Sequence, residues 1–289
     1  GLMHLRAFRE AFDETVAVLR HHVSFDLCDA MSTGDMLHHT DRSQAAIFAH
    51  EVASARALEA YGGRPRFLVG HSIGEFAALH IAGVLSLEDA ARLVAARGHL
   101  MAELPEGGIM VAVHAPADRV TKALEAVPDV ALAAVNGPTS VVLSGPNDAV
   151  TAVVDELTAQ GVRTRRLKVS HAFHSPMMAP MRDEFVRIAQ TATFHQPELP
   201  IISTVTGEPI DAVDADYLGC QVMSSVRFAD AVGSLVERGV DTYLEVGPSA
   251  VLTSQVSEVV PEEAVVLPLQ RGDVDAQHEG FVRALAHLE

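Results

Sequence analysis

The chain has 289 residues, 48% of them apolar, which is enough to bury a sizeable core in one large domain or two closely joined ones. Its 21 Lys and Arg against 38 Asp and Glu give a formal net charge of −17, and no stretch is basic enough to grip a nucleic-acid backbone. No uncharged apolar run is long enough to span a membrane and no secretory signal opens the chain, so we expect a cytoplasmic protein with no nucleic-acid or membrane partner.

The two cysteines, Cys28 and Cys220, are too few for a disulfide framework and show no CxxC spacing. This usage fits a reducing cytosol or a compartment in which thiols play no part. We expect both to be small buried side chains.

The first third of the chain carries the pattern helix, helix, strand, helix, helix. The Gly62-Gly63 pair ends the second helix, Gly83 ends the third, and Ser86 is a suitable N-cap for the fourth because acidic residues follow it. The expected helices cover 5–20, 43–60, 72–83 and 86–104, and the buried strand covers 66–70.

The segment 107–170 divides into six short elements separated by turn residues. In order they are strand 109–115, helix 116–127, strand 130–137, strand 140–146, helix 147–161 and strand 162–170. This βαββαβ order is the split, ferredoxin-like arrangement. We therefore expect 107–170 to form a small inserted subdomain, with 1–106 and 171–289 forming the large one.

Beyond residue 170, helices and strands alternate again, which favours an α/β fold with a mostly parallel sheet and helices on both faces. The expected elements are helix 176–190, strand 200–207, helix 227–239, strand 241–247, helix 249–259, strand 264–269 and a terminal helix.

A possible nucleophile lies in "LVGHSIGEFAALHIAGVLS", residues 68–86. Ser72 stands between Gly70 and Gly74, after an expected strand and before an expected helix, which is the context of a GxSxG nucleophile elbow. Two glycines without Cβ atoms permit the tight turn, and the N-terminus of the helix directs N–H groups toward a developing oxyanion. The alternative is a small structural serine in a tight turn.

A base for Ser72 has to come from elsewhere in the chain. "SHAFHSPMM" supplies His171 and His174 at the expected junction between subdomains, where clefts form. They could equally be solvated loop residues or an HxxH metal pair, although no third ligand stands at recognisable spacing. Arg97, in "AARGHLM", could stabilise the C-terminal end of its helix through the helix dipole, or it could bind a carboxylate through two N–H groups of its guanidinium.

Four segments together resemble the acyltransferase domains of modular polyketide synthases and the related malonyl-CoA:acyl carrier protein transacylases. They are "GHSIGEFAALHIAGVLSLEDAARLVAARGHLM", "AVNGPTSVVLSGP", "HAFHSPMM" and "VRFADAVGSLVERGVDTYLEVGP". The likeness runs from about residue 5 to the C-terminus. It implies an α/β-hydrolase-like large subdomain with an inserted ferredoxin-like small one, in agreement with the order of elements.

The resemblance also implies roles for individual residues. Ser72 would be acylated, His174 would be its base, and Arg97 would hold the carboxylate of the extender unit. Asn136 would order the site, and Gln44 would line the same cleft.

Further roles implied by the resemblance concern residues close to these. A backbone carbonyl of the loop 245–248 would orient the histidine, and the N–H of Ile73 would be an oxyanion donor. His71 also falls in the substrate-binding set. "HAFH" is similar to the malonyl pattern, in which Phe173 fills the space that an α-methyl branch needs, although one methyl group is worth only about 1–3 kcal/mol.

The expected activity is therefore transfer of a malonyl group from malonyl-CoA to the phosphopantetheine thiol of an acyl carrier protein, with no bound cofactor or metal. Other polyketide synthase domains would be further partners. Two departures from the family stand out: no Gly-Gln-Gly strand precedes Leu5, so the chain starts downstream of that strand or lacks it, and Leu218 replaces a usual tryptophan.

Two other functions remain open at this stage. A serine hydrolase or thioesterase would use Ser72 with Asp241 and either His278 or His287, an order that α/β-hydrolases allow. An inactive docking module within a larger synthase would fold but form no acyl-Ser72.

Overall fold

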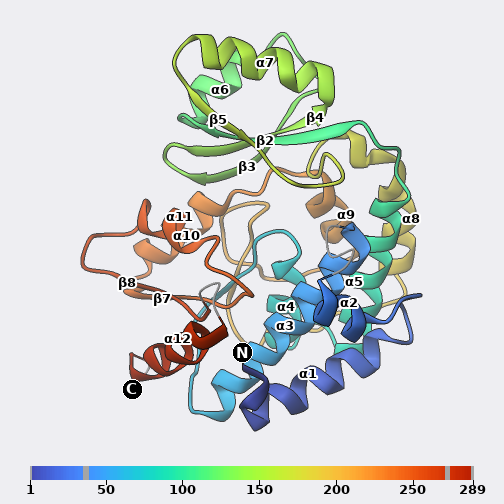
Figure 1. Cartoon of the computed structure of the whole chain (residues 1–289), viewed down its shortest axis with the longest axis vertical. Coiled ribbons are helices and arrows are strands. Elements are labelled where there is room, and N and C mark those ends of the chain that lie inside the picture. The colour runs from blue at the N-terminus through green and yellow to red at the C-terminus, as the bar shows by residue number, and fades with distance from the viewer. Residues whose placement is uncertain (1, 35–38, 271–273, 288–289) are drawn as a thin grey trace.

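The computed structural model describes residues 2–34, 39–270 and 274–287, and for 274–278 the backbone only. It shows the expected α/β fold, with a small antiparallel sheet set above a helix-rich body (Figure 1). The helices are α1 (Arg6–Leu19), α2 (Leu27–Thr33), α3 (Thr40–Ala60), α4 (Gly74–Ile81), α5 (Leu87–Ala102), α6 (Ala117–Leu124), α7 (Asn147–Ala159), α8 (Ala179–Ala189), α9 (Ala215–Met223), α10 (Phe228–Glu237), α11 (Thr253–Ser257) and α12 (Val274–Ala286). The strands are β1 (Leu68–Val69), β2 (Gly108–His114), β3 (Ala131–Gly137), β4 (Ser140–Pro146), β5 (Arg163–Arg166), β6 (Ile201–Ile202), β7 (Thr242–Glu245) and β8 (Val265–Pro268). Among the residues described, no helix is both long enough and apolar enough to cross a membrane.

The helix boundaries follow local chemistry. The Ser86 hydroxyl accepts the N–H of Asp89 at 3.0 Å, which caps α5 as expected. Gly83, after α4, adopts φ +80°, which costs a glycine little. Helices α2 and α9 were not expected from the sequence; aspartates, Asp26 and Asp214, cap them.

The small sheet confirms the βαββαβ arrangement. Its strand order is β3-β4-β2-β5, all neighbours are antiparallel, and α6 and α7 cover one face (Figure 1). Val111 and Val113 of β2 pack against Val120 of α6 and Val150 of α7 in one apolar cluster. The sheet therefore has one face covered by its own helices, α6 and α7, and an opposite face, called the open face below, against which neither α6 nor α7 packs.

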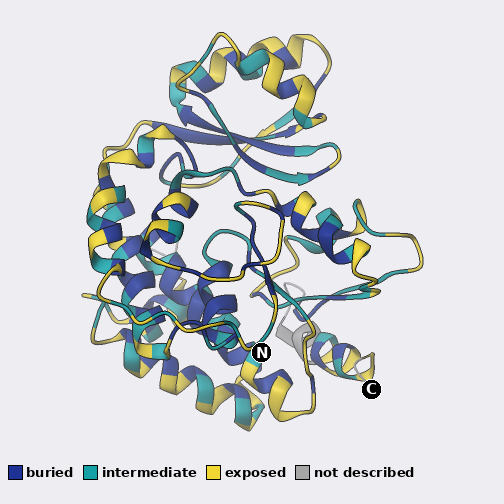
Figure 2. Cartoon of the chain, turned by 180° about the vertical axis from the view of Figure 1, so that it is seen from behind, coloured by how far each residue is buried: buried dark blue, intermediate teal, exposed yellow. Residues whose placement is uncertain are grey.

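The parallel part of the fold consists of two strand pairs. β1 pairs with β6, and β7 pairs with β8, both in parallel register. These strands are shorter than the sequence pattern predicts, with two residues each in β1 and β6 and four each in β7 and β8. Figure 2 shows buried residues concentrated in the helix-rich body, with exposed residues along its outer helix surfaces.

The small sheet is joined to the large subdomain by an apolar cluster on its open face. Met110 and Val142 pack there with Phe228 of α10. A larger cluster centred on Phe48, Phe76 and other buried side chains holds the helices together.

The expectation that both cysteines are buried is wrong. Cys28 is partly exposed on α2, and Cys220 is exposed on α9. On α9 the buried face carries other residues, Leu218 among them, because helical periodicity turns position 220 toward solvent. Leu218 is fully buried in the larger cluster.

Candidate active site

Ser72 occupies a sharp turn between β1 and α4. Its φ is +53°, in the left-handed region that non-glycine residues rarely adopt and that costs about 1–3 kcal/mol. A Cβ built on Gly70 would lie 2.2 Å from the Cα of Glu75, so only glycine fits there. A Cβ on Gly74 would meet a Glu51 oxygen at 3.4 Å, an ordinary contact. The turn therefore requires the first glycine of the motif but not the second.

Ser72 and His174 form a hydrogen-bonded pair. Ser72 Oγ lies 2.7 Å from His174 Nε2, and His174 Nδ1 lies 2.9 Å from the backbone carbonyl of Ser224. Because a carbonyl can only accept, Nδ1 carries the proton, and Nε2 is free to accept the serine proton. His174 also has a positive φ, +54°, so both residues of the pair hold strained backbones.

The expectation that a backbone carbonyl of the loop 245–248 orients His174 is wrong. Ser224, the residue that follows α9, supplies it instead. Glu245 of that loop caps a helix, because its carboxylate accepts the N–H groups of Val251, Leu252 and Thr253 at 2.7–2.8 Å, at the start of α11.

Burial, together with the nearby charges of Arg97 and His71, lowers the pKa of His174 to about 3. The side chain is 4% exposed. The imidazole is therefore neutral at physiological pH, which is the form that can take a proton from Ser72.

Arg97 reaches the same hydroxyl from α5. Its Nη2 donates to Ser72 Oγ at 3.2 Å, and its Nη1 donates to Gln44 Oε1 of α3 at 2.5 Å. Gln44 is itself held by a contact from its Nε2 to the sulfur of Met101, 3.3 Å away. The sequence-predicted residues Ser72, Arg97 and Gln44 thus meet in one site.

The Arg97 guanidinium is a buried cation with no carboxylate of a described residue in direct contact, although the charge of the nearby buried Glu75 opposes the lowering of its pKa. It is 2% exposed, its Nε forms no hydrogen bond, and it takes part in no ion pair with any residue that the structure describes. Burial lowers its pKa to about 10, so it stays protonated at neutral pH. Such a group favours an anion beside Ser72.

Asn136 and His71 form a second pair next to the turn. His71 Nε2 donates to Asn136 Oδ1 of β3 at 2.9 Å, and the His71 ring lies 5.4 Å from the ring of Phe228. The bond links the small sheet to the residue before Ser72. It fixes the position of the turn relative to the open face.

Ile73 caps α4, and its N–H forms no hydrogen bond with any described residue, so it can donate to an oxyanion beside Ser72.

Phe173 is half-buried and packs against two apolar clusters, and no contact places its ring against Ser72. His171 does not reach Ser72: its ring nitrogens lie 2.9 Å from Ser170 Oγ and 3.0 Å from the Leu104 carbonyl.

Sequence reasoning missed the residues whose hydrogen bonds hold the Ser72 turn and the start of α4 in place. Gln221 of α9 donates from Nε2 to the Ser72 carbonyl at 2.8 Å. Glu75, fully buried, accepts bonds from Tyr217 and from Thr204, the latter at 2.9 Å. Burial raises the pKa of Glu75, and these hydrogen bonds oppose the rise. Lone polar residues in apolar helices, such as Gln221 in "LGCQVM", are the signal that could have found them.

Two residues of the alternative hydrolase triad, Asp241 and His287, do not meet Ser72. Asp241 is exposed, and His287 is an exposed residue whose ring contacts the Arg283 carbonyl at 2.9 Å. The side chain of His278 lies outside the described residues. Across the described ranges, no group of three or more His, Cys, Asp or Glu side chains is placed to hold a metal ion.

The site combines a half-buried serine in a tight turn, a neutral histidine of fixed tautomer, a free backbone N–H and a buried cation. These groups can activate a hydroxyl, stabilise a tetrahedral oxyanion and hold an acyl group that carries a carboxylate.

Comparison with known proteins agrees with this chemistry. The sequence profile of the acyl transferase domain matches residues 1–289. The mycoketide-CoA synthase of Mycobacterium tuberculosis is 48% identical over 262 residues, 89% of this chain, and the chain spans 6% of that protein. The acyltransferase domain from the second module of the salinomycin polyketide synthase is 48% identical with a TM-score of 0.92, covering 98% of this chain and 67% of the other.

A more distant structure shares the fold. The malonyl CoA-acyl carrier protein transacylase of Coxiella burnetii is 28% identical with a TM-score of 0.87, covering 96% of this chain and 90% of the other. The chain therefore belongs to the acyl transferase domain family, together with the acyltransferase domains of modular polyketide synthases.

Proposed function

We propose that this domain moves a malonyl group from malonyl-CoA to the phosphopantetheine thiol of an acyl carrier protein in a polyketide synthase. The observation that carries the proposal is the position of the Ser72 hydroxyl between a proton acceptor, His174 Nε2 at 2.7 Å, and a buried cation, Arg97 Nη2 at 3.2 Å. A hydrolase of neutral esters has no need of that cation.

In the first half-reaction, Ser72 Oγ attacks the thioester carbonyl while His174 takes its proton. The Ile73 N–H stabilises the oxyanion. As the tetrahedral intermediate collapses, the C–S bond breaks, His174 returns the proton to the leaving sulfur, and coenzyme A departs with an intact thiol. Ser72 is left as an acyl ester.

In the second half-reaction, the thiol of the carrier protein gives its proton to His174 and attacks the ester carbonyl. The C–O bond to Ser72 breaks, and His174 returns the proton to Ser72 Oγ. No redox or metal chemistry is needed, so we propose malonyl-CoA and the carrier thiol as the two substrates, without a bound cofactor.

The remaining site residues would bind the acyl group. The Arg97 fork is proposed to turn from Gln44 and Ser72 toward the malonyl carboxylate, with Gln44 and the Asn136–His71 pair ordering the cleft around it. Phe173, in "HAFH", is proposed to restrict the space for an α-methyl branch, which supports malonyl over methylmalonyl.

The test is intact-protein mass spectrometry after brief incubation with malonyl-CoA, methylmalonyl-CoA or acetyl-CoA separately. We expect a malonyl adduct that is absent from Ser72→Ala and is discharged by holo acyl carrier protein faster than by water. Prompt discharge by water alone would indicate a hydrolase, and an adduct that persists in Ser72→Ala would refute the assignment of the nucleophile.

A further inference from the structure

Strand β5 and the residues after it carry a concentrated positive charge in an acidic chain. Arg163, Arg165, Arg166 and Lys168 fill four of the six positions 163–168, whereas the whole chain has a net charge of −17. All four are exposed, and none forms an ion pair or a side-chain hydrogen bond with a residue that the structure describes. We name residues 163–168 the basic edge.

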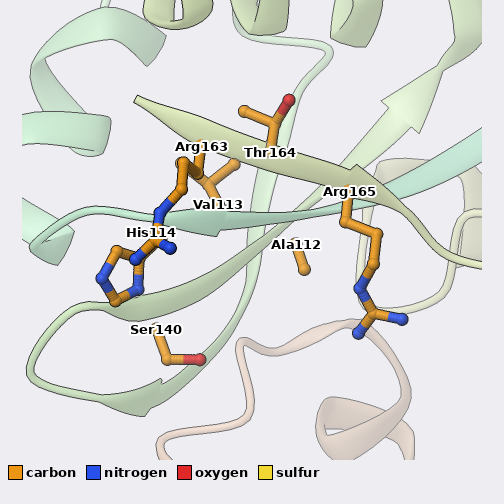
Figure 3. Close-up of a pocket in the computed structure, with 7 residues that line it drawn as sticks. All are labelled: Ala112, Val113, His114, Ser140, Arg163, Thr164 and Arg165. Atoms are coloured by element: carbon orange, nitrogen blue, oxygen red, sulfur yellow. The ribbon is translucent and has the colours of Figure 1, made fainter. Parts of the chain in front are cut away.

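Two of these arginines lie on the open face of the small sheet. β5 is an outer strand, and its register places Arg163 opposite His114 and Arg165 opposite Ala112. Opposite residues of an antiparallel pair share a face, so both arginines lie on the side away from α6 and α7. Figure 3 shows them projecting on the side of Ser140, with Thr164 on the other. They line a hollow of about 260 Å³.

The open face leads to the catalytic turn. Met110, also on this face, packs with Phe228, whose ring lies 5.4 Å from that of His71, the residue before Ser72. The chain itself makes a second connection, because Lys168 precedes His174 by only six residues. Six residues span at most about 22 Å when fully extended.

Beside the basic edge lies a second, partly apolar hollow. It has a volume of about 450 Å³ and is lined by residues 166–170, including the exposed side chain of Val169. An exposed apolar residue close to two exposed cations, Arg166 and Lys168, combines apolar contact area with positive charge, as small protein-binding surfaces do.

Positive charge on an outer strand also has a simpler explanation, since charged side chains prevent edge-to-edge pairing of sheets. That protection needs charge of either sign. A docking role needs positive charge, and so the two explanations differ in what happens when the sign is reversed.

We propose that the basic edge, together with Val169, is the surface on which an acidic carrier protein docks to present its acceptor thiol. This inference rests on the proposed function, which requires a protein-borne thiol to reach Ser72. Charges farther away than about 8–10 Å are screened at physiological salt. An acidic surface that approaches the open face therefore responds to the local cations, Arg163 and Arg165 first, rather than to the net charge of the domain.

The test reverses two charges, in the variant R163E/R165E. The matched control is R119E/K122E, which reverses two exposed charges on α6, behind the same sheet. A recombinant holo acyl carrier protein is titrated against each variant in a Ser72→Ala background, with fluorescence anisotropy as the readout. We expect R163E/R165E to weaken binding about tenfold or more and to remove most of its salt dependence, with the control unchanged.

The same variants with Ser72 intact separate docking from chemistry. R163E/R165E should load malonyl at the parental rate and transfer it normally to free pantetheine, an uncharged thiol, while kcat/KM for the carrier protein falls about tenfold. Equal carrier affinity for R163E/R165E, the control and the parent would overturn the proposal. A raised KM for malonyl-CoA with unchanged carrier affinity would also overturn it, because the edge would then hold coenzyme A phosphates.

The binding measurement does not depend on acyl transfer. If the parent forms no acyl-Ser72, the proposed function fails, yet loss of carrier binding in R163E/R165E alone would still support the docking surface.

Discussion

Replacing Arg97 with alanine should lower the preference for malonyl over acetyl groups by about 10²–10³-fold. In the proposed acyl-enzyme the guanidinium pairs with the malonyl carboxylate inside the site, where Arg97 is 2% exposed. Removing one partner of a buried, hydrogen-bonded charge pair costs about 3–5 kcal/mol. The lower part of that range corresponds to the stated factor, since 1.36 kcal/mol is tenfold in rate. An acetyl group has no carboxylate and escapes this loss.

The substitution has a second consequence at His174. The Arg97 charge lowers the His174 pKa, so its removal should raise that pKa toward the ordinary value near 6.5. Acetyl loading by Arg97→Ala should therefore slow at a higher pH than in the parent as the solution is acidified. Arg97→Lys is the matched control, because it keeps the charge but not the fork, and it should lose less malonyl rate than the alanine variant.

The assay is the initial rate of Ser72 acylation by malonyl-CoA and by acetyl-CoA in separate reactions, followed by intact mass. Gln44 loses its hydrogen-bond donor in Arg97→Ala, which can cost about 1–3 kcal/mol of stability, so thermal unfolding of each variant is measured alongside. A folded Arg97→Ala enzyme with the parental ratio of malonyl to acetyl rates would refute the reasoning.

Three further predictions concern the turn and the base. Gly70→Ala should destabilise the protein by about 1–3 kcal/mol or more and reduce acylation, because the new Cβ would lie 2.2 Å from the backbone of α4. Gly74→Ala should unfold at the same temperature as the parent or at a higher one. Equal melting temperatures for the two variants would contradict this. As the solution is acidified, the acylation rate should show no fall near pH 6.5, because His174 becomes protonated only near its pKa of about 3. A midpoint between pH 6 and 7 in the profile of rate against pH would rule this out. Phe173→Ala should raise the rate with methylmalonyl-CoA relative to malonyl-CoA by about 10- to 200-fold, measured by competition between the two thioesters, and an unchanged ratio would remove Phe173 from the specificity argument.

The same shift at His174 predicts a stability effect. Its folded pKa of about 3 lies below the ordinary value of 6.5, so between these values the unfolded chain binds more protons than the folded one. Stability contributed by this group should therefore fall as pH drops from about 6.5 toward 3.

Features that depend on neighbouring residues were predictable from the sequence. The Ser72 turn needs a strand, two flanking residues and a helix, all within a few positions, and the βαββαβ order of the small subdomain follows from local periodicity and turn residues. The exception inside the turn is Gly74, which the motif suggests is needed and the packing shows is not. The boundaries assigned to the two subdomains remain a prediction.

Features that depend on backbone partners were not predictable. His171 and His174 share one motif, and only the resemblance to a family names His174 as the base; no local pattern in the residues tells the two apart. The carbonyls of Leu104 and Ser224 separate them, and any residue type can supply a carbonyl. The prediction that a carbonyl of the loop 245–248 orients His174 was wrong for that reason.

The sequence by itself determined the α/β class and the glycine-flanked turn at Ser72, because periodicity and glycine chemistry act over short distances, whereas the other expected site residues came from the resemblance to a family. Only the tertiary structure decided that Arg97 and Gln44 meet at Ser72, that Ser224 sets the His174 tautomer, and that the basic edge lies on an open face. Each of these depends on how elements far apart in the chain pack and in which register strands pair, and no local pattern encodes either.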